Sequence, residues 1–171
     1  LSSISYNTIN IFAFFIISFV TVACCFANQI SVQIVQHNLA LDYVSEQSLI
    51  VEDELLNGFF DQGYIVTNSE AAVSDSAEKD ADLFHLGFGE AYDGASDYFV
   101  QIKLFYEGSL KKEDLTVVPS KLDRIDLVVM KVSSGEKVKE SSIKGLEKKS
   151  GTDEGVRLVS GTLIKEIRKV L

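Results

Sequence analysis

The sequence predicts an α+β fold, a mixed β-sheet with helices packed against it, in the approximate order βαβαβββα. Apolar residues alternate with a period of two in several short segments, and they recur at helical spacing in others. The two kinds of segment are interspersed along the chain, as in an α+β domain. The chain has 171 residues, of which 46% are hydrophobic and 24% charged, so its length and composition suit a globular protein with one main domain.

The first predicted unit is a strand, a helix and a second strand. Residues 30–35 alternate as a half-buried strand does. Ser45 can cap the helix that follows, whose acidic first turns suit the positive end of the helix dipole, and Gly63 ends it. The predicted apolar stripe of this helix contains Leu49, Leu55, Leu56, Phe59 and Phe60. Residues 64–67 form the next short strand.

The second half of the chain predicts another helix, three strands and a C-terminal helix. The first of these helices has its apolar face at Phe84, Phe88, Ala91 and Tyr92. Residues 98–106 form the clearest strand, and residues 125–132 and 137–143 form a hairpin around the turn 133–136. The C-terminal amphipathic helix is predicted from Val156, Val159, Leu163, Ile167 and Val170.

The amino-terminal segment 1–27 predicts export. It carries no charged side chain, and its apolar run at 9–22 is shorter than the about 20 residues of a membrane span. Cys25-Phe26-Ala27 places small residues where signal peptidase requires them, so we expect a signal peptide over 1–27 and one mature domain over 28–171. The first ten residues include no Lys or Arg, which indicates a start that has lost a basic region. A buried helix of the domain is the alternative for this segment.

The two cysteines leave a second form of export open. In a lipoprotein, Thr21-Val22-Ala23-Cys24 would serve as a loose lipobox, and Cys24 would become the acylated first residue. Cleavage after Ala27 would instead leave a mature chain without cysteine, and therefore without disulfides. In both cases we expect a periplasmic or secreted protein, or an outer-membrane lipoprotein, with no membrane span in its mature form.

The charges divide the predicted mature chain into two halves. Residues 28–97 contain fourteen acids and one base, for a net charge of −13, whereas residues 98–171 contain eleven acids and fifteen bases, for a net charge of +4. The halves can attract each other within one fold or present faces of opposite sign to partners. Because the whole chain carries a net charge of −9, we expect no nucleic-acid partner.

Three phrases of the sequence resemble a group of bacterial envelope domains. They are LLNGFFDQGYIVTN, AYDGASDYFVQIKLF and the hairpin LDRIDLVVMKVSSGEKVKESS with the helix after it. The group includes the lipoprotein activators of penicillin-binding proteins, the periplasmic domain of the curli secretion channel and the amino-terminal domain of the Tol-Pal propeller protein. The resemblance covers about residues 30–170, but the segment 108–121 has no counterpart in it. It implies an anticodon-binding-like fold and a non-catalytic role in contacting other envelope proteins.

The sequence carries no complete catalytic motif, so we expect no enzymatic activity and no cofactor. Gly87-Phe88-Gly89-Glu90-Ala91-Tyr92 begins like a dinucleotide-binding loop, but Tyr92 replaces the third glycine and no strand precedes it. Helix packing therefore explains these glycines better. There is no phosphate-binding loop and no GxSxG elbow, and the spacing of Glu52-Asp53-Glu54 spreads these carboxylates around a helix. His85 could share a metal with Asp80 and Asp82, yet no second His lies nearby, so we predict no metal site.

Two classes of function follow. The first is a non-enzymatic envelope protein that binds another protein, in the regulation of cell-wall synthesis or as an accessory of secretion or assembly. The alternative is an exported small-ligand- or metal-binding domain or a hydrolase. For the first class, we predict a contact surface on the polar face of the central strands and hairpin, made of Gln101, Lys103, Lys131, Lys137 and Lys139. Charge reversal at Lys137 and Lys139 should weaken the binding of an acidic partner and leave the melting temperature nearly unchanged. The alternative role of these lysines is to protect an edge hairpin from aggregation.

Overall fold

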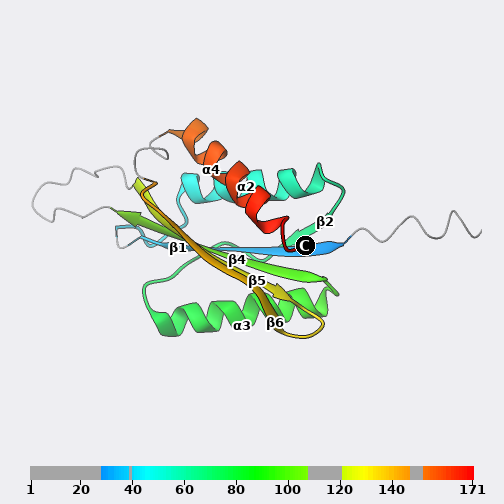
Figure 1. Ribbon diagram of the computed structural model, residues 1–171. Helices are drawn as coiled ribbons and strands as arrows, with labels where there is room; N and C mark the ends of the chain where they lie inside the picture. The colour runs from blue at the N-terminus through cyan, green and yellow to red at the C-terminus, as the bar shows by residue number, and fades with distance from the viewer. Residues whose placement is uncertain (1–27, 39, 108–120, 147–151) are drawn as a thin grey trace, which may run out of the picture.

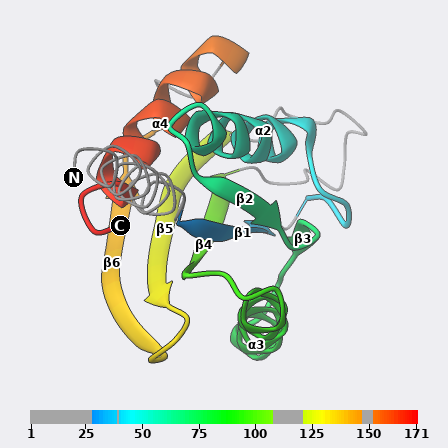
Figure 2. The ribbon, with the colours of Figure 1, turned by 90° about the vertical axis from the view of Figure 1, so that its right-hand side faces the viewer.

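A mixed sheet of six strands forms the middle layer of the described part of the chain (Figures 1 and 2). The structure is a computed structural model and describes residues 28–38, 40–107, 121–146 and 152–171. Helices α2 and α4 cover one face of the sheet, and α3 covers part of the other (Figure 2). The elements are β1 (Gln29–His37), α2 (Glu46–Phe60), β2 (Ile65–Asn68), β3 (Ala72–Val73), α3 (Ala77–Asp93), β4 (Tyr98–Glu107), β5 (Lys121–Lys131), β6 (Glu136–Lys144) and α4 (Asp153–Ile167).

The strands lie in the order β2-β1-β4-β5-β6, with β3 also paired to β1. β1 is parallel to β2, β3 and β4, whereas β5 is antiparallel to both of its neighbours. The predicted α+β class is therefore confirmed, and the element order is close to the predicted one. The difference is β3, whose two residues are too few to show a period of two.

Strand β1 is buried on both faces, which corrects the prediction of a half-buried strand. Ile30, Val32 and Ile34 face α2 and α4, while Ser31 and Gln33 lie under α3, with 3% and 1% of their surface exposed. The alternation of polar and apolar residues suggested a solvent-facing side. The polar side instead faces α3. Polar side chains can be buried there because hydrogen bonds satisfy them: the Gln33 amide donates to the carbonyl oxygen of Leu83 at 3.0 Å.

The helices begin where the sequence provides caps. The side chains of Ser45, Ser76 and Thr152 each accept a hydrogen bond from the backbone N–H three residues further on. Helix α2 ends shortly before Gly63, whose φ of +85° lies in the left-handed region that favours glycine. The predicted start and end of this helix are therefore confirmed.

The main core lies between the sheet and the α2–α4 pair, and a smaller cluster lies under α3. Leu55 and Phe59 of α2 are fully buried in the main core, as predicted. In the small cluster, the rings of Phe84 and Phe88 meet Phe99 edge-on at 5.6 and 5.9 Å between centroids. Three residues assigned to the buried stripes, Leu49, Phe60 and Tyr92, are instead exposed at 45%, 70% and 65%. They lie at the margins of the predicted apolar stripes, which were drawn too wide because helical spacing alone does not show how far the core extends.

The division of charge along the chain becomes a division in space. The acidic half, residues 28–97, forms β1, α2, β2, β3 and α3, whereas the basic half forms β4, β5, β6 and α4. Since β1 and β4 are neighbours, the boundary between the halves runs along the middle of the sheet. Among the described residues, two ion pairs cross it, Lys103 with Asp80 at 2.6 Å and Arg157 with Glu54. The halves therefore attract each other within one fold and also present oppositely charged sides.

Candidate functional site

The structure places Gln101 and Lys103 on the α3 side of β4, where both are engaged within the domain. Gln101 is only 2% exposed, and its amide donates to Oε1 of Gln33 at 2.8 Å. Lys103 Nζ donates to Oδ2 of Asp80 on α3 at 2.6 Å. Gln101 therefore lies under α3, away from the surface that a partner could touch, although its strand position suggested an outward-facing side chain.

The three lysines of the hairpin have different surroundings. Lys131 is exposed at the end of β5. Lys137 is exposed and pairs with Glu140 at 2.6 Å on the same strand. Lys139 turns to the opposite face of the sheet, where its Nζ donates to the backbone oxygen of Glu166 at 2.9 Å and to Oε2 of the same residue at 3.0 Å. The five predicted residues are thus not gathered into one patch.

A polar hollow lies on the open part of the sheet, beside α3. Its volume is about 320 Å³, and its lining includes Arg124, Asp126, Ser142 and Lys144 of β5 and β6. The Arg124 guanidinium lies 3.7 Å from the centre of the Phe105 ring and 3.3 Å from Oδ1 of Asp126. Ser142 donates to the same carboxylate oxygen at 2.6 Å. Most of these groups are already paired with one another.

A titratable cluster joins the ends of β1 and β4 to α3. His37 stacks on Phe105 with 4.3 Å between ring centroids, and its Nε2 lies 3.0 Å from Oδ1 of Asp80. Burial lowers the pKa of His37 below 6.5, and it outweighs the opposing effect of the Asp80 charge. Burial raises the pKa of Asp80, but hydrogen bonds from Lys103 and Ser74 outweigh it, so the pKa lies below 3.8. The cluster ties α3 to the sheet around an ionised Asp80.

The residues considered for a metal do not converge. Asp80 points to Lys103 and His37, whereas His85 and Asp82 are exposed on α3. Within the ranges that the structure describes, no group of three His, Cys, Asp or Glu side chains could hold a metal ion. Gly87, considered for a nucleotide loop, lies inside α3 and allows the helix to approach Gln33 closely. Cys24 and the predicted signal peptide lie outside the described residues.

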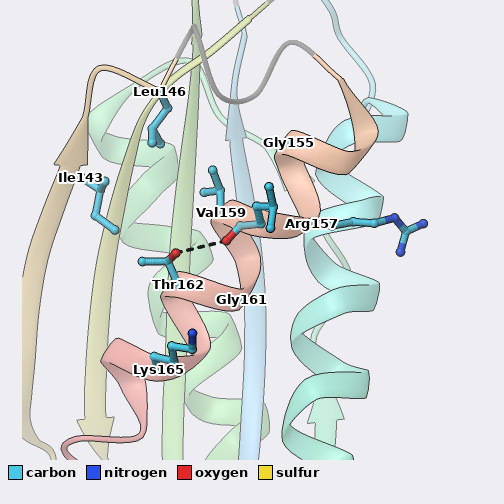
Figure 3. Close-up of a pocket in the computed structure, with 9 residues that line it drawn as sticks. Ile143, Leu146, Gly155, Arg157, Val159, Gly161, Thr162 and Lys165 are labelled. Carbon is cyan, nitrogen blue, oxygen red and sulfur yellow. Dashed lines mark hydrogen bonds between the residues drawn. The ribbon is translucent and has the colours of Figure 1, made fainter.

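An apolar groove lies between α4 and β6 (Figure 3). Its volume is about 610 Å³. Ile143 of β6 and Leu146 after it approach the groove from one side, and α4 closes the other (Figure 3). The α4 lining includes Leu158, Val159, Gly161 and Thr162. Leu158 is 71% exposed, the highest value among the large hydrophobic side chains that are exposed in the described part of the chain.

Helix α4 therefore has one face in the core and a second face along the groove. Val156, Val159, Leu163 and Ile167 are buried in the core, as the helical spacing predicted. Leu158, Thr162 and Lys165 follow one another at i, i+4 and i+7, so they form a second stripe along the groove. The sequence pattern did not predict this stripe, because one apolar residue does not make a periodic signal. The available signal was a leucine outside the core stripe and near a glycine, Gly161.

The charged residues in the lining of the groove are cations. They are Arg157, which pairs with Glu54, and Lys165, for which no ion pair occurs among the described residues. No acidic side chain belongs to the lining within the described ranges. The groove therefore offers apolar surface beside positive charge. In the same ranges, no helix is both long enough and apolar enough to cross a membrane.

Comparison with protein families places the chain in one of them. Residues 29–171 match a family model described as "Uncharacterised protein", and the chain belongs to this family. The match extends over both faces of the sheet, the polar hollow and the apolar groove. No curated protein matches the chain.

Several solved structures of bacterial proteins are similar to this chain. A PelC dodecamer from Paraburkholderia phytofirmans has 15% identity and a TM-score of 0.45, with 81% of this chain and 86% of that chain covered. TolB from Acinetobacter baumannii has 13% identity and a TM-score of 0.40, and the match covers 85% of this chain but only 28% of TolB. The C-terminal domain of LpoB from Salmonella enterica has 11% identity, a TM-score of 0.34 and coverages of 71% and 87%.

Proposed function

We propose that this protein is exported to the bacterial envelope, where it binds another protein and catalyses no reaction. The observation that supports binding is the apolar groove between α4 and β6, with Leu158 exposed at its rim. A partner that covers this surface removes apolar area from water, which is the main favourable contribution to most protein association. The partner would be another envelope protein, in cell-wall regulation or in secretion and assembly. Acylation at Cys24 would add a lipid anchor.

A crosslinking experiment with two matched variants tests this proposal. Leu158→Asp places a charge at the groove, while Leu86→Asp does the same on α3, where Leu86 is 58% exposed. Both changes should leave the melting temperature nearly unaltered, because both side chains are largely in solvent. Crosslinking in the native envelope should then capture the same specific partner with the wild type and with Leu86→Asp. Leu158→Asp should lose it.

The opposite results would overturn the proposal. Equal capture by wild type and Leu158→Asp would show that the groove is not the binding surface. If both variants lost the partner equally, the added negative charge would prevent binding wherever it is placed, and the groove would not be the specific binding surface.

We do not propose the alternative of a small-ligand site or a hydrolase. Its best location would be the polar hollow on β5 and β6, where charged and hydroxyl side chains meet. Arg124, Asp126 and Ser142 are however held by one another and by Phe105, so they present few free groups to a ligand.

A further inference from the structure

Within the described sheet, strand β6 pairs along one edge only. Its paired edge joins β5 from Arg124↔Lys144 to Lys131↔Glu136. In the described part of the chain, no strand pairs with the other edge. β6 is therefore an edge strand, on the side of the sheet opposite β2 and β3 (Figure 2). An open edge presents backbone N–H and C=O groups that can pair with another strand.

A hollow lies on each face of this same strand. On the α4 face, Ile143 lines the apolar groove (Figure 3), and on the other face Glu140, Ser142 and Lys144 line the polar hollow. A strand added to the open edge would direct successive side chains to the two faces in turn. Every second side chain would thus reach the apolar groove, and those between would reach polar surface.

The charges favour an acidic partner segment. Lys165 of α4 lies at the groove and Lys144 of β6 at the polar hollow, and neither has an ion pair among the described residues. Carboxylates at the ends of an added strand could pair with them.

We propose that β6 binds an extended segment of a partner protein as an additional strand of the sheet. The segment has apolar side chains at every second position, which enter the groove beside Ile143 and Leu158, and carboxylates that pair with Lys144 and Lys165. Backbone hydrogen bonds to β6 provide affinity, and the groove provides specificity. This inference rests on the proposed function, since it names the binding mode and the chemistry of the partner.

The backbone contribution can be tested with a labelled peptide of the sequence Glu-Val-Thr-Val-Thr-Val-Thr-Glu. Two further versions carry N-methyl groups, either on all valines or on all threonines. Because a strand uses the N–H groups of alternate residues toward one edge, only one of the two versions should lose affinity, by about tenfold or more. If the peptide lay in the groove without pairing to β6, both methylation patterns would change its affinity by similar amounts. Fluorescence anisotropy with the intact protein provides the affinities.

Separate controls test where the peptide binds and whether its carboxylates contribute to the affinity. Gly161→Leu fills the groove, since a Cβ at Gly161 meets nothing within 4 Å, and Gly89→Leu is its matched control on α3, where the same holds. Gly161→Leu should weaken binding about tenfold or more, while Gly89→Leu should not. A peptide with lysine at both ends should bind more weakly than the acidic one, and the difference should shrink in salt. Hydrogen exchange should slow at β6 amides when the acidic peptide binds.

The outcomes separate this inference from the proposed function. If no peptide binds at about millimolar concentration, or if both methylated versions behave alike, strand addition is wrong. The Leu158→Asp crosslinking result can still support protein binding in that case. If peptides bind but Gly161→Leu has no effect, the groove does not receive the segment and the inference is overturned.

Discussion

Lys137 and Lys139 lie two residues apart on β6, yet the fold uses them differently. Lys137 and its partner Glu140 are both exposed, with 50% and 63% of their side-chain surface in solvent, whereas only 16% of the Lys139 side chain is exposed and it binds Glu166 of α4 through two oxygens. Exposed ion pairs of the first kind contribute little to stability. We therefore expect charge reversal to spare stability at Lys137 and to lower it at Lys139.

Two single variants test this difference. Lys139→Glu should lower the melting temperature by roughly 3 °C or more, because it removes the bonds to α4 and places a negative charge beside Glu166. Lys137→Glu should change it by about 1 °C or less. Calorimetric or circular-dichroism melts of both variants provide the comparison. Equal shifts would show that the contact between β6 and α4 does not contribute to stability.

His37 should make stability depend on pH between neutral and mildly acidic conditions. Its pKa in the folded state lies below 6.5 because of burial, so the unfolded chain takes up a proton first as the pH falls. The free energy of unfolding should therefore decrease from about pH 6.5 down to the folded-state pKa. Asp80, Lys103 and Arg124 are the charged groups around this ring, and Asp80 stays ionised throughout this range.

Melting temperatures at about pH 7.5 and 5 should show this effect. The fall between the two values should be smaller in His37→Gln than in the wild type. His85→Gln, which changes an exposed histidine of α3, should behave as the wild type does. An unchanged fall in His37→Gln would assign the pH dependence to other groups.

At the scale of elements, two glycines of α3 allow a matched test of how the helix packs. A Cβ at Gly87 would lie 2.7 Å from Nε2 of Gln33, which is buried and held by Leu83 and Gln101. A Cβ at Gly89 would meet nothing within 4 Å. The close approach at Gly87 therefore depends on the absence of a side chain, whereas a side chain at Gly89 has room.

Alanine at each position should change stability in opposite directions. Gly87→Ala should lower the free energy of unfolding by about 1–3 kcal/mol, since the Gln33 side chain cannot move without losing its hydrogen bonds. Gly89→Ala should raise it by up to about 1 kcal/mol, because alanine favours a helix. Urea unfolding measures both values. Stabilisation by both variants would show that Gln33 moves aside at little cost.

At the scale of the whole molecule, we predict that the chain is exported and that its amino-terminal segment is processed. The uncharged segment 1–27 should be removed, and mass spectrometry of the native protein should find Asn28 or an acylated Cys24 as its first residue. A chain that retains 1–27 in the cytosolic fraction would contradict the prediction. The two accepted outcomes also decide between a soluble and a lipid-anchored protein.

Sequence patterns predicted most of the elements because their signals are local. Ser45 and Gly63 marked the ends of α2, and the alternation in residues 98–106 marked β4, since caps and strand periods depend on neighbours in the chain. The resemblance to envelope domains likewise came from short local phrases. Such patterns failed at Leu49 and Phe60. Their helical spacing predicted burial, but both side chains are exposed.

Local patterns were sufficient to predict the fold class and the main strands and helices, and composition was sufficient to show the division of charge between the halves. The arrangement of the segments in space decides which faces are covered: α3 buries Gln101, α4 engages Lys139, and Leu158 remains exposed at the groove between α4 and β6. The physical reason is that local periodicity depends on backbone geometry within one segment. Burial, ion pairing and an open strand edge depend instead on which segments, distant in the chain, meet across the sheet.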